Sequence, residues 1–265
     1  MLHIFERDKI LKISLDLGAS LAGVADIDSI KGAPSYRLLK KIGSNPGVIF
    51  GREMEEKLRF KWPVNARSAI VIALHHPQDR PHLDWWDGKG GTEGNRILVR
   101  ICEQLSDSIE KKFNFKCHRI PYLVENGGVF LKDSAVMAGL GCIGKNNMLV
   151  TPSFGPRVRL QALLLEERLP PTGPVHFDPC DGCLEHCLKA CPQAAFEYKG
   201  YSSVSLGMLR LPGRNGRFSR QTCNIQMLQD IKGEGLDRAA TGTGEISTPV
   251  HYCRECELAC PVGKK

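Results

Sequence analysis

The chain has 265 residues, a length that suits one large domain or one and a half domains. Of these residues 42% are hydrophobic and 25% charged, a composition that excludes a disordered protein. Its longest apolar run, from Ala69 to Leu74, is too short to span a bilayer, and its first residues lack the apolar core of an export signal, so we expect a cytoplasmic protein and no membrane partner. The net charge of +7 comes from scattered lysines and arginines without a run of five, which favours a solvated surface over a nucleic-acid patch.

The first half of the chain predicts a mixture of helices and strands. Apolar residues at helical spacing predict a helix from Asp8 to Leu17, and the segment from Leu21 to Ile27 has the composition of a short strand. The continuous apolar run from Ser68 to Leu74 indicates a strand buried on both faces. His75 and His76 follow it and either terminate the strand or face a cofactor.

The next segments continue this alternation. Trp85 and Trp86 stand in a loop and either cover a ligand pocket or pack onto the body of the protein. Apolar residues recur every four positions from Ile97 to Phe113, which predicts the clearest helix of the chain. Strands are predicted for residues 115–120 and 157–166, a helix for residues 130–138 and an exposed loop for residues 233–249.

Seven of the eleven cysteines fall in two runs near the end of the chain. The runs read CDGCLEHCLKACP, from Cys180 to Pro192, and CRECELACP, from Cys253 to Pro261. Each ends in Cys-Pro, as does the bacterial ferredoxin run, whose last cysteine ligates the other of two clusters. We therefore predict two [4Fe–4S] clusters with crossed ligands, and Cys223 is the obvious eighth ligand.

The predicted ligand sets follow from this crossing. The first set is Cys180, Cys183, Cys187 and Cys260, and the second is Cys191, Cys223, Cys253 and Cys256. Three residues separate the second and third cysteines of the first run, where the ferredoxin pattern has two, so the loop must bulge by one residue. Structural zinc remains an alternative because C-x2-C pairs also bind zinc, although zinc does not explain two Cys-Pro endings.

The segment GLGCIGK, from Gly139 to Lys145, matches the letters of a dinucleotide-binding fingerprint. That fingerprint requires a strand before the glycines and a helix after them, whereas a helix is predicted before these glycines. We therefore do not expect a nicotinamide cofactor here. Glycines do allow a close approach of the backbone to a large ligand.

The order of these features resembles the epoxyqueuosine reductase family, whose core is related to reductive dehalogenases. The resemblance rests on LKDSAVMAGLGCIGKNNMLVTPSFG, on the following strand and on the two cysteine runs, and it covers most of the chain. It implies an α+β fold, in which a nitroreductase-like α/β sandwich, residues 1–170, holds cobalamin and precedes a ferredoxin-like two-cluster module, residues 171–265. The division falls at the break Leu169-Pro170-Pro171.

The resemblance also implies site residues. An acidic residue ahead of the glycine segment serves as proton donor in the family, and the position that aligns here is Glu125, where the family usually has aspartate. The corrinoid contacts are expected along the glycine segment, at Gly139, Gly141, Cys142, Gly144 and Lys145. Cys142 replaces a family tryptophan and is either a packing residue or a thiol that faces the metal.

Two further departures bear on the substrate. The family's C-terminal helical repeats, which are implicated in holding transfer RNA, have no counterpart in this sequence. The tyrosine-histidine segment usually found before the long helix is replaced by GTEGNRIL. We therefore expect transfer RNA not to be the substrate.

Two functions follow from these features. The first is an oxidoreductase that passes electrons from a low-potential donor, such as ferredoxin or flavodoxin, through two [4Fe–4S] clusters to a corrinoid cobalt. We expect its cell to be able to protect the clusters from oxygen. The alternative is an electron-transfer or activator protein that reduces the corrinoid of a partner protein. An enzyme retains its own corrinoid, whereas an activator binds a corrinoid protein.

Overall fold

The computed structural model describes residues 3–39, 62–86, 91–122, 128–197, 199–200, 202–207, 209, 211, 213–233 and 249–264. The elements of the first half are α1 (Ile4–Asp16), β1 (Leu21–Asp26), α2 (Ile27–Lys31), α3 (Pro34–Leu39), β2 (Ser68–His75), the 3-10 helix η1 (Pro81–Asp84), α4 (Glu93–Phe113) and β3 (Cys117–Arg119). Those of the second half are α5 (Leu131–Met137), β4 (Cys142–Ile143), β5 (Leu149–Val150), β6 (Val158–Leu165), α6 (His186–Lys189), α7 (Ser203–Leu206), α8 (Arg220–Gly233) and α9 (Glu255–Leu258).

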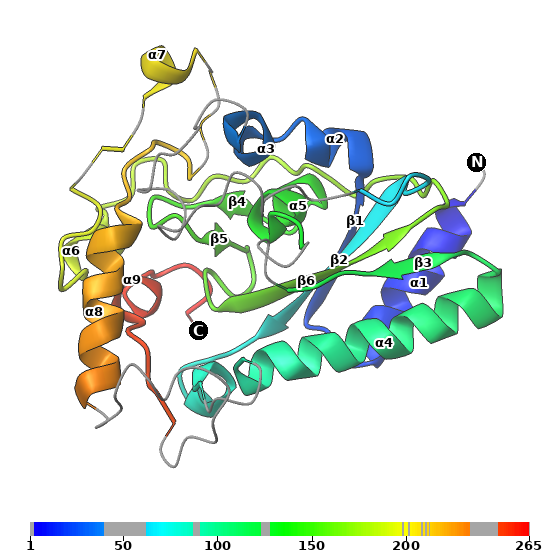
Figure 1. The fold of residues 1–265 in the computed structure, drawn as a ribbon, viewed down its shortest axis with the longest axis horizontal. Helices are drawn as coiled ribbons and strands as arrows, with labels where there is room; N and C mark the ends of the chain where they lie inside the picture. Colours follow the sequence, from blue (N-terminus) through cyan, green and yellow to red (C-terminus); the bar gives the residue numbers. More distant parts are fainter. Residues whose placement is uncertain are drawn as a thin grey trace.

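A four-stranded sheet of order β1-β2-β6-β3 forms the centre of the fold, and every neighbouring pair is antiparallel. Helices α1 and α4 cover one face of this sheet, and α2 and α5 lie on the other (Figure 1). The predicted α+β class is therefore confirmed. The strands at the centre of the sheet are buried on both faces because both faces carry helices.

The alternation of side chains along β2 explains the two hydrophobic cores. Ile70 and Ile72 pack toward α1 and α4, together with Leu98 and Leu105 of α4. The positions between them carry Ala69, Val71 and Ala73, which pack toward α5. Successive side chains of a strand point to opposite faces, so this strand presents its largest residues to the long helix and small ones to α5.

Most of the predicted elements are confirmed, with ends shifted by a few residues. The helix predicted from Asp8 begins earlier, at Ile4, and the predicted strand from Leu21 ends at Asp26 because the Asp26 side chain caps α2. The long helix and the strand before the Pro-Pro break occur as α4 and β6. The prediction for residues 233–249 falls almost entirely outside the described residues.

The segment after β6 runs as an extended chain into the region of α6, α8 and α9, which lie beyond one end of the sheet (Figure 1). The short helices α6 and α9, one from each cysteine run, pack against each other. Arg157, at the start of β6, joins the second run to the sheet because its guanidinium donates to the carbonyls of Glu257, Cys260 and Val262. Within the described residues, no helix has the length and apolar character needed to cross a bilayer.

Candidate functional site

All eleven cysteines are free of disulfide bonds, and eight of them fall into two groups of thiols that act on one another electrostatically. Burial raises the pKa of Cys187 to about 11, and the nearby thiols of Cys260, Cys180 and Cys183 add to this rise. Burial likewise raises the pKa of Cys256, with contributions from Cys253, Cys223 and Cys191. Each group therefore unites thiols from both cysteine runs, and the second adds Cys223 of α8.

The turn geometry of the first run allows its thiols to converge. Gly182 and Glu185 have left-handed backbones, with φ of 65° and 60°, on either side of the Cys183-Leu184 pair. The left-handed residue Glu185 precedes α6 and falls within the three-residue spacing between Cys183 and Cys187. The backbone N–H of Cys180 donates to the Asp178 carboxylate at 3.1 Å, which orients the start of the run.

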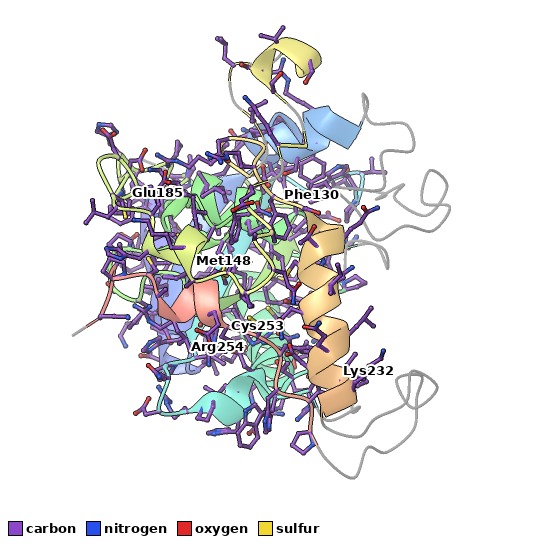
Figure 2. All side chains as sticks on the ribbon, turned by 90° about the vertical axis from the view of Figure 1, so that its left-hand side faces the viewer. Phe130, Met148, Glu185, Lys232, Cys253 and Arg254 are labelled. Carbon is purple, nitrogen blue, oxygen red and sulfur yellow. The ribbon has the colours of Figure 1, made fainter. Side chains whose placement is uncertain are left out.

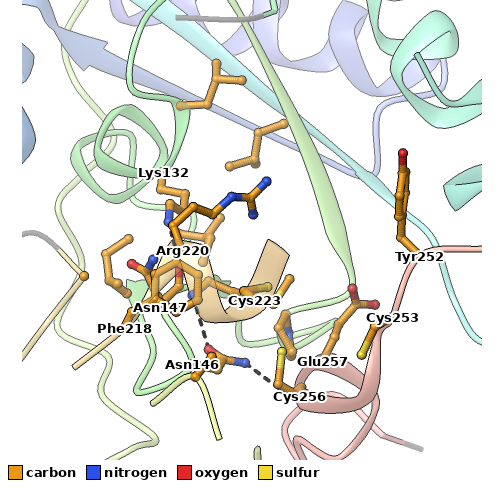
Figure 3. A pocket seen from close by; sticks show the side chains of 18 of the residues that line it. Lys132, Asn146, Asn147, Phe218, Arg220, Cys223, Tyr252, Cys253, Cys256 and Glu257 are labelled. Carbon is orange, nitrogen blue, oxygen red and sulfur yellow. Dashed lines mark hydrogen bonds between the residues drawn. The ribbon is translucent and has the colours of Figure 1, made fainter. Parts of the chain in front are cut away.

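A cavity of about 680 Å³ lies between residues of α5 and β6 on one side and residues of the two cysteine runs and α8 on the other. Helix α5, the segment after β4 and the start of β6 form one part of its wall, and the four cysteines of the second group form another (Figure 3). The cysteines of the first group are not among the lining residues. The apolar side chains of the lining include Val129, Phe130, Leu131, Ile143, Met148, Leu149, Pro156, Val158, Leu160, Phe196, Phe218 and Met227.

The segment from Cys142 to Leu149 contacts both cysteine groups and the cavity. Cys142 lies near Cys180, whose thiol adds to the rise in the Cys142 pKa that burial causes, to about 11. Asn146 donates its side-chain N–H to the carbonyl of Cys256 at 3.3 Å (Figure 3). Ile143 and Met148 line the cavity. The β4–β5 hairpin therefore contacts the first cysteine group, the second cysteine group and the cavity.

The glycines of this segment make room for the protein's own backbone. A Cβ on Gly141 would lie 2.1 Å from the Val150 carbonyl oxygen, and a Cβ on Gly139 would lie 2.8 Å from that of Thr172. Lys145 forms an ion pair with Glu185 at 2.9 Å. None of the five predicted corrinoid contacts, Gly139, Gly141, Cys142, Gly144 and Lys145, is among the residues that line the cavity.

A buried charge network closes the cavity near α9. His76 Nδ1 lies 2.7 Å from the Asp84 carboxylate, and Arg254 Nε lies 2.7 Å from the same group. Arg159 also pairs with Asp84, and Arg254 pairs with Glu257. Burial alone would raise the pKa of Asp84, but the hydrogen bond with His76 and the charges of Arg159 and Arg254 lower it to about 2.

His76, Asp84 and Glu257 are close enough together to hold a metal ion. The guanidinium groups of Arg159 and Arg254 already supply two positive charges to the carboxylates of Asp84 and Glu257. The charge of this group is therefore balanced without a metal ion. The sequence interpretation of His76 left two alternatives open, and the structure places its side chain in this network at the cavity wall. Asp84 lies eight positions from His76, but Arg254 lies 178 positions away, so no local pattern could identify the whole network.

The remaining predicted residues have the following places. Glu125 lies outside the described residues. Trp86 forms a β-bridge with Val250, and the centroid of the Trp85 ring lies 4.4 Å from the centroid of the His251 ring. Both tryptophans therefore pack onto the C-terminal segment. Cys102 is buried on α4, and Cys117 of β3 packs against the same core.

No family model matches the chain, but individual proteins do. An epoxyqueuosine reductase of Lactococcus garvieae is 23% identical over 271 residues, covering 97% of this chain and 70% of the relative. That of Bacillus subtilis is 24% identical over 272 residues, covering 97% of this chain and 64% of the relative. The resemblance inferred from the motifs is thus confirmed as homology along most of the chain, which spans about two thirds of the length of these relatives.

Solved structures share the fold. The epoxyqueuosine reductase of Bacillus subtilis superimposes with a TM-score of 0.63 at 22% identity, covering 98% of this chain and 66% of that one. An epoxyqueuosine reductase in complex with an epoxyqueuosine-modified tRNA stem loop gives a TM-score of 0.62 at 21% identity, with 98% and 65% covered. A catabolic reductive dehalogenase in complex with 3-bromo-4-hydroxybenzoic acid gives 0.59 at 14% identity, with 97% and 31% covered.

Proposed function

We propose that this protein is a corrinoid-dependent iron–sulfur reductase whose reaction takes place in the cavity beside the second cysteine group. The observation that carries the proposal is the position of Cys191, Cys223, Cys253 and Cys256, which come from three separate segments and share one wall of the cavity. The relatives are named as reductases, which supports an oxidoreductase. The alternative of an activator protein gains no support from them.

Each cysteine group offers the donor set of a [4Fe–4S] cluster. Four thiolates are the usual ligands of such a cluster, and the crossed membership of the two groups is that of a two-cluster ferredoxin. In this proposal Cys180, Cys183, Cys187 and Cys260 hold one cluster and the cavity-lining group holds the other. The second cluster is then the one nearer the cavity, and an external ferredoxin or flavodoxin docks on the side of the first.

The cavity suits a large, mainly apolar cofactor with polar groups at its rim. Its volume of about 680 Å³ lies in the range of cofactor and ligand sites, and a cluster on its wall would take up part of that space. Residues Ile143, Met148 and Leu149 supply an apolar surface, and Asn146 and Asn147 supply amides. When bound, the clusters supply one-electron transfer and a corrinoid supplies a cobalt centre that accepts those electrons.

Three finer predictions remain part of the proposal: the division at residue 170 into a nitroreductase-like domain and a ferredoxin-like module, a cytoplasmic location and an oxygen-protected cell. The predicted corrinoid contacts Gly139, Gly141, Cys142, Gly144 and Lys145 do not line the cavity, so we propose that their segment acts on a corrinoid through its other residues. Because Gly139 and Gly141 pack against backbone, we assign them the shaping of the β4–β5 hairpin, whose Ile143 and Met148 face the cavity.

Glu125 is proposed as the proton donor. Tyr122 and Val129, which are three and four positions from Glu125 in the sequence, both line the cavity. A general acid typically contributes about 10²–10⁴ in rate. The Glu125→Gln variant should therefore lose turnover while it keeps its iron and its corrinoid, and full turnover in that variant would remove the assignment.

The expectation that transfer RNA is not the substrate now has a finding against it, because a structural neighbour was solved with a tRNA stem loop. We therefore propose an epoxyqueuosine-modified tRNA stem loop as the first substrate to test. A chain that reduces it shares the substrate of its relatives. If the protein does not reduce this RNA but does reduce another substrate, the original expectation is supported.

The central test is a metal analysis of protein reconstituted anaerobically with cobalamin supplied. About eight irons and one cobalt per chain support the corrinoid reductase. Eight irons without cobalt would overturn the corrinoid assignment and favour the activator. Zinc in place of iron would overturn both.

A further inference from the structure

One ring nitrogen of His76 is left for a molecule in the cavity. His76 directly follows β2, and its side chain lines the cavity although the residue is only 2% exposed. Its Nδ1 lies 2.7 Å from the Asp84 carboxylate. Within the part of the chain that the structure describes, the other ring nitrogen, Nε2, has no hydrogen-bond partner.

The Asp84 carboxylate fixes the tautomer of the His76 ring. Burial alone would raise the pKa of Asp84, but its hydrogen bond with His76 and two arginine charges lower it to about 2, so the carboxylate only accepts. Arg254 Nη2 lies 3.0 Å from the same Nδ1, but a guanidinium only donates, and it donates to the His76 carbonyl at 2.8 Å. The proton between His76 and Asp84 therefore sits on Nδ1, and Nε2 is the nitrogen that gains and releases a proton.

The titratable and charged groups around this ring come from β2, from the 3-10 helix η1, from β6 and from the second cysteine run. In this order they are His75, Asp84, Arg159, Arg254 and Glu257. The two arginines pair with the two carboxylates, and Asp84 holds the ring by its Nδ1. A change in the protonation of Nε2 therefore breaks none of the hydrogen bonds of this network.

The proposed reaction consumes protons as well as electrons. When an epoxide is reduced to an alkene, both C–O bonds break, a C=C bond forms, and the oxygen leaves as water after the uptake of two electrons and two protons. In the proposed function a reduced ferredoxin or flavodoxin supplies the electrons and Glu125 supplies one proton. One proton remains to be supplied, and histidine is the side chain most often used for such a transfer.

We infer that His76 is a second catalytic proton donor, which passes the proton of Nε2 to the departing oxygen of a substrate held in the cavity, and that Asp84 is its positioning residue. The inference rests on the proposed function in one respect, namely that the cavity is the site of the reduction. After the transfer Nε2 takes a new proton from solvent, which restores the donor. The Nδ1 proton stays in place, so Asp84 keeps its charge throughout.

The first experiment measures access to Nε2 without turnover. Diethyl pyrocarbonate transfers its ethoxycarbonyl group to a neutral imidazole nitrogen, and peptide mass spectrometry locates the modified histidine. In cluster-loaded protein without corrinoid, His76 should be modified through the cavity, and the exposed His82 confirms that the reagent is active. An unmodified His76 beside a modified His82 would overturn the inference.

The second experiment compares the turnover of two matched variants on the epoxyqueuosine-modified tRNA stem loop. Glutamine keeps an N–H for Asp84 but exchanges no proton near neutral pH, so His76→Gln should lower turnover roughly 10²-fold or more at unchanged iron content. His118 also pairs with a carboxylate, Glu166 at 3.0 Å, but it is not among the lining residues, so His118→Gln should turn over at the unchanged rate.

The pH profile separates a proton donor from a residue that only supports the fold. The kcat of the unchanged protein should depend on the ionisation of two acids, and His76→Gln should lose one of the two, whereas added imidazole should restore turnover to His76→Gly. Unchanged turnover with an unchanged profile, or a loss that accompanies loss of iron and that imidazole does not restore, would overturn the inference. Protein that binds no cobalamin would count against the proposed function alone, because the modification of His76 does not depend on the corrinoid.

Discussion

The side-chain amide of Asn146 donates a hydrogen bond to the backbone carbonyl of Cys256 across 110 positions of the chain, at 3.3 Å. Its carbonyl oxygen accepts the N–H of Met148, which faces the cavity. The segment that follows the glycines thus holds a thiol-bearing helix on one side and the cavity wall on the other. In the view of Figure 2, Met148 is labelled above Cys253 and Arg254 of the second cysteine run.

Removing this bond tests its role directly. Asn146→Ala should lower the free energy of unfolding by about 0.5–1.5 kcal/mol, the usual net value of a hydrogen bond, and should alter the electron paramagnetic resonance of one reduced cluster while iron content stays constant. Asn215→Ala is a control because that side chain bonds only within its own exposed loop among the described residues. Identical spectra for both variants would show that Asn146 does not influence the second cluster.

Arg157 anchors the end of the second run to the sheet. It is 5% exposed and donates to three carbonyls, so Arg157→Met leaves buried acceptors unpaired and should cost about 2–4 kcal/mol of stability. We expect loss of iron from the group that contains Cys260 before loss from the other. Arg119→Met removes a surface ion pair with Asp107 and should change the melting temperature little, and an equal fall in both variants would contradict the anchoring role.

The proposed ligand sets differ in their response to single cysteine changes. Cys223→Ser should remove or convert one cluster and leave the other largely intact, as measured by iron and sulfide analysis. Cys142→Ser is the matched control, since Cys142 lies beside Cys180 but is not a proposed ligand, and it should keep all of the iron. Cys102→Ser and Cys117→Ser should do the same. Unchanged iron in Cys223→Ser would refute the choice of eighth ligand.

A substitution at Gly141 tests whether this glycine shapes the β4–β5 hairpin or contacts a corrinoid. Gly141→Ala places a Cβ 2.1 Å from the Val150 carbonyl oxygen, which cannot be accommodated without moving the β4–β5 hairpin. The melting temperature should therefore fall even in protein that holds no corrinoid. Gly32→Ala, with its nearest neighbour at 3.5 Å, should leave it nearly unchanged. A loss of corrinoid affinity at unchanged melting temperature would instead identify Gly141 as a cofactor contact.

The pKa of Lys132 falls from 10.5 to about 8 in the folded protein because burial disfavours the charged ammonium. The same shift has a consequence for stability. The pKa of Lys132 in the folded state lies below its unfolded value, so burial of the charged lysine destabilises the folded protein. This destabilisation is fully present below about pH 8. That cost is relieved as pH rises from about 8 to 10.5. Chemical denaturation of Lys132→Met should lack this gain within that window.

Local patterns in the sequence determined the elements and the grouping of chemistry-bearing residues. The four-residue periodicity of α4 and the apolar runs of β2 and β6 are properties of neighbouring residues, so both type and position could be predicted. The cysteine spacing likewise indicated ligand sets without a structure. The short hairpin of β4 and β5 was missed because two-residue strands leave no periodicity to detect.

The cavity and its charges were decided only by the tertiary structure. His76 and Arg254 are 178 positions apart and meet because β2 ends where the second cysteine run is anchored. Lys132 and Arg220 reach one wall from α5 and α8, and neither carries a motif. Such contacts depend on how separate elements pack, and since no short-range pattern encodes packing, the sequence alone supplies the residues but not their meeting place.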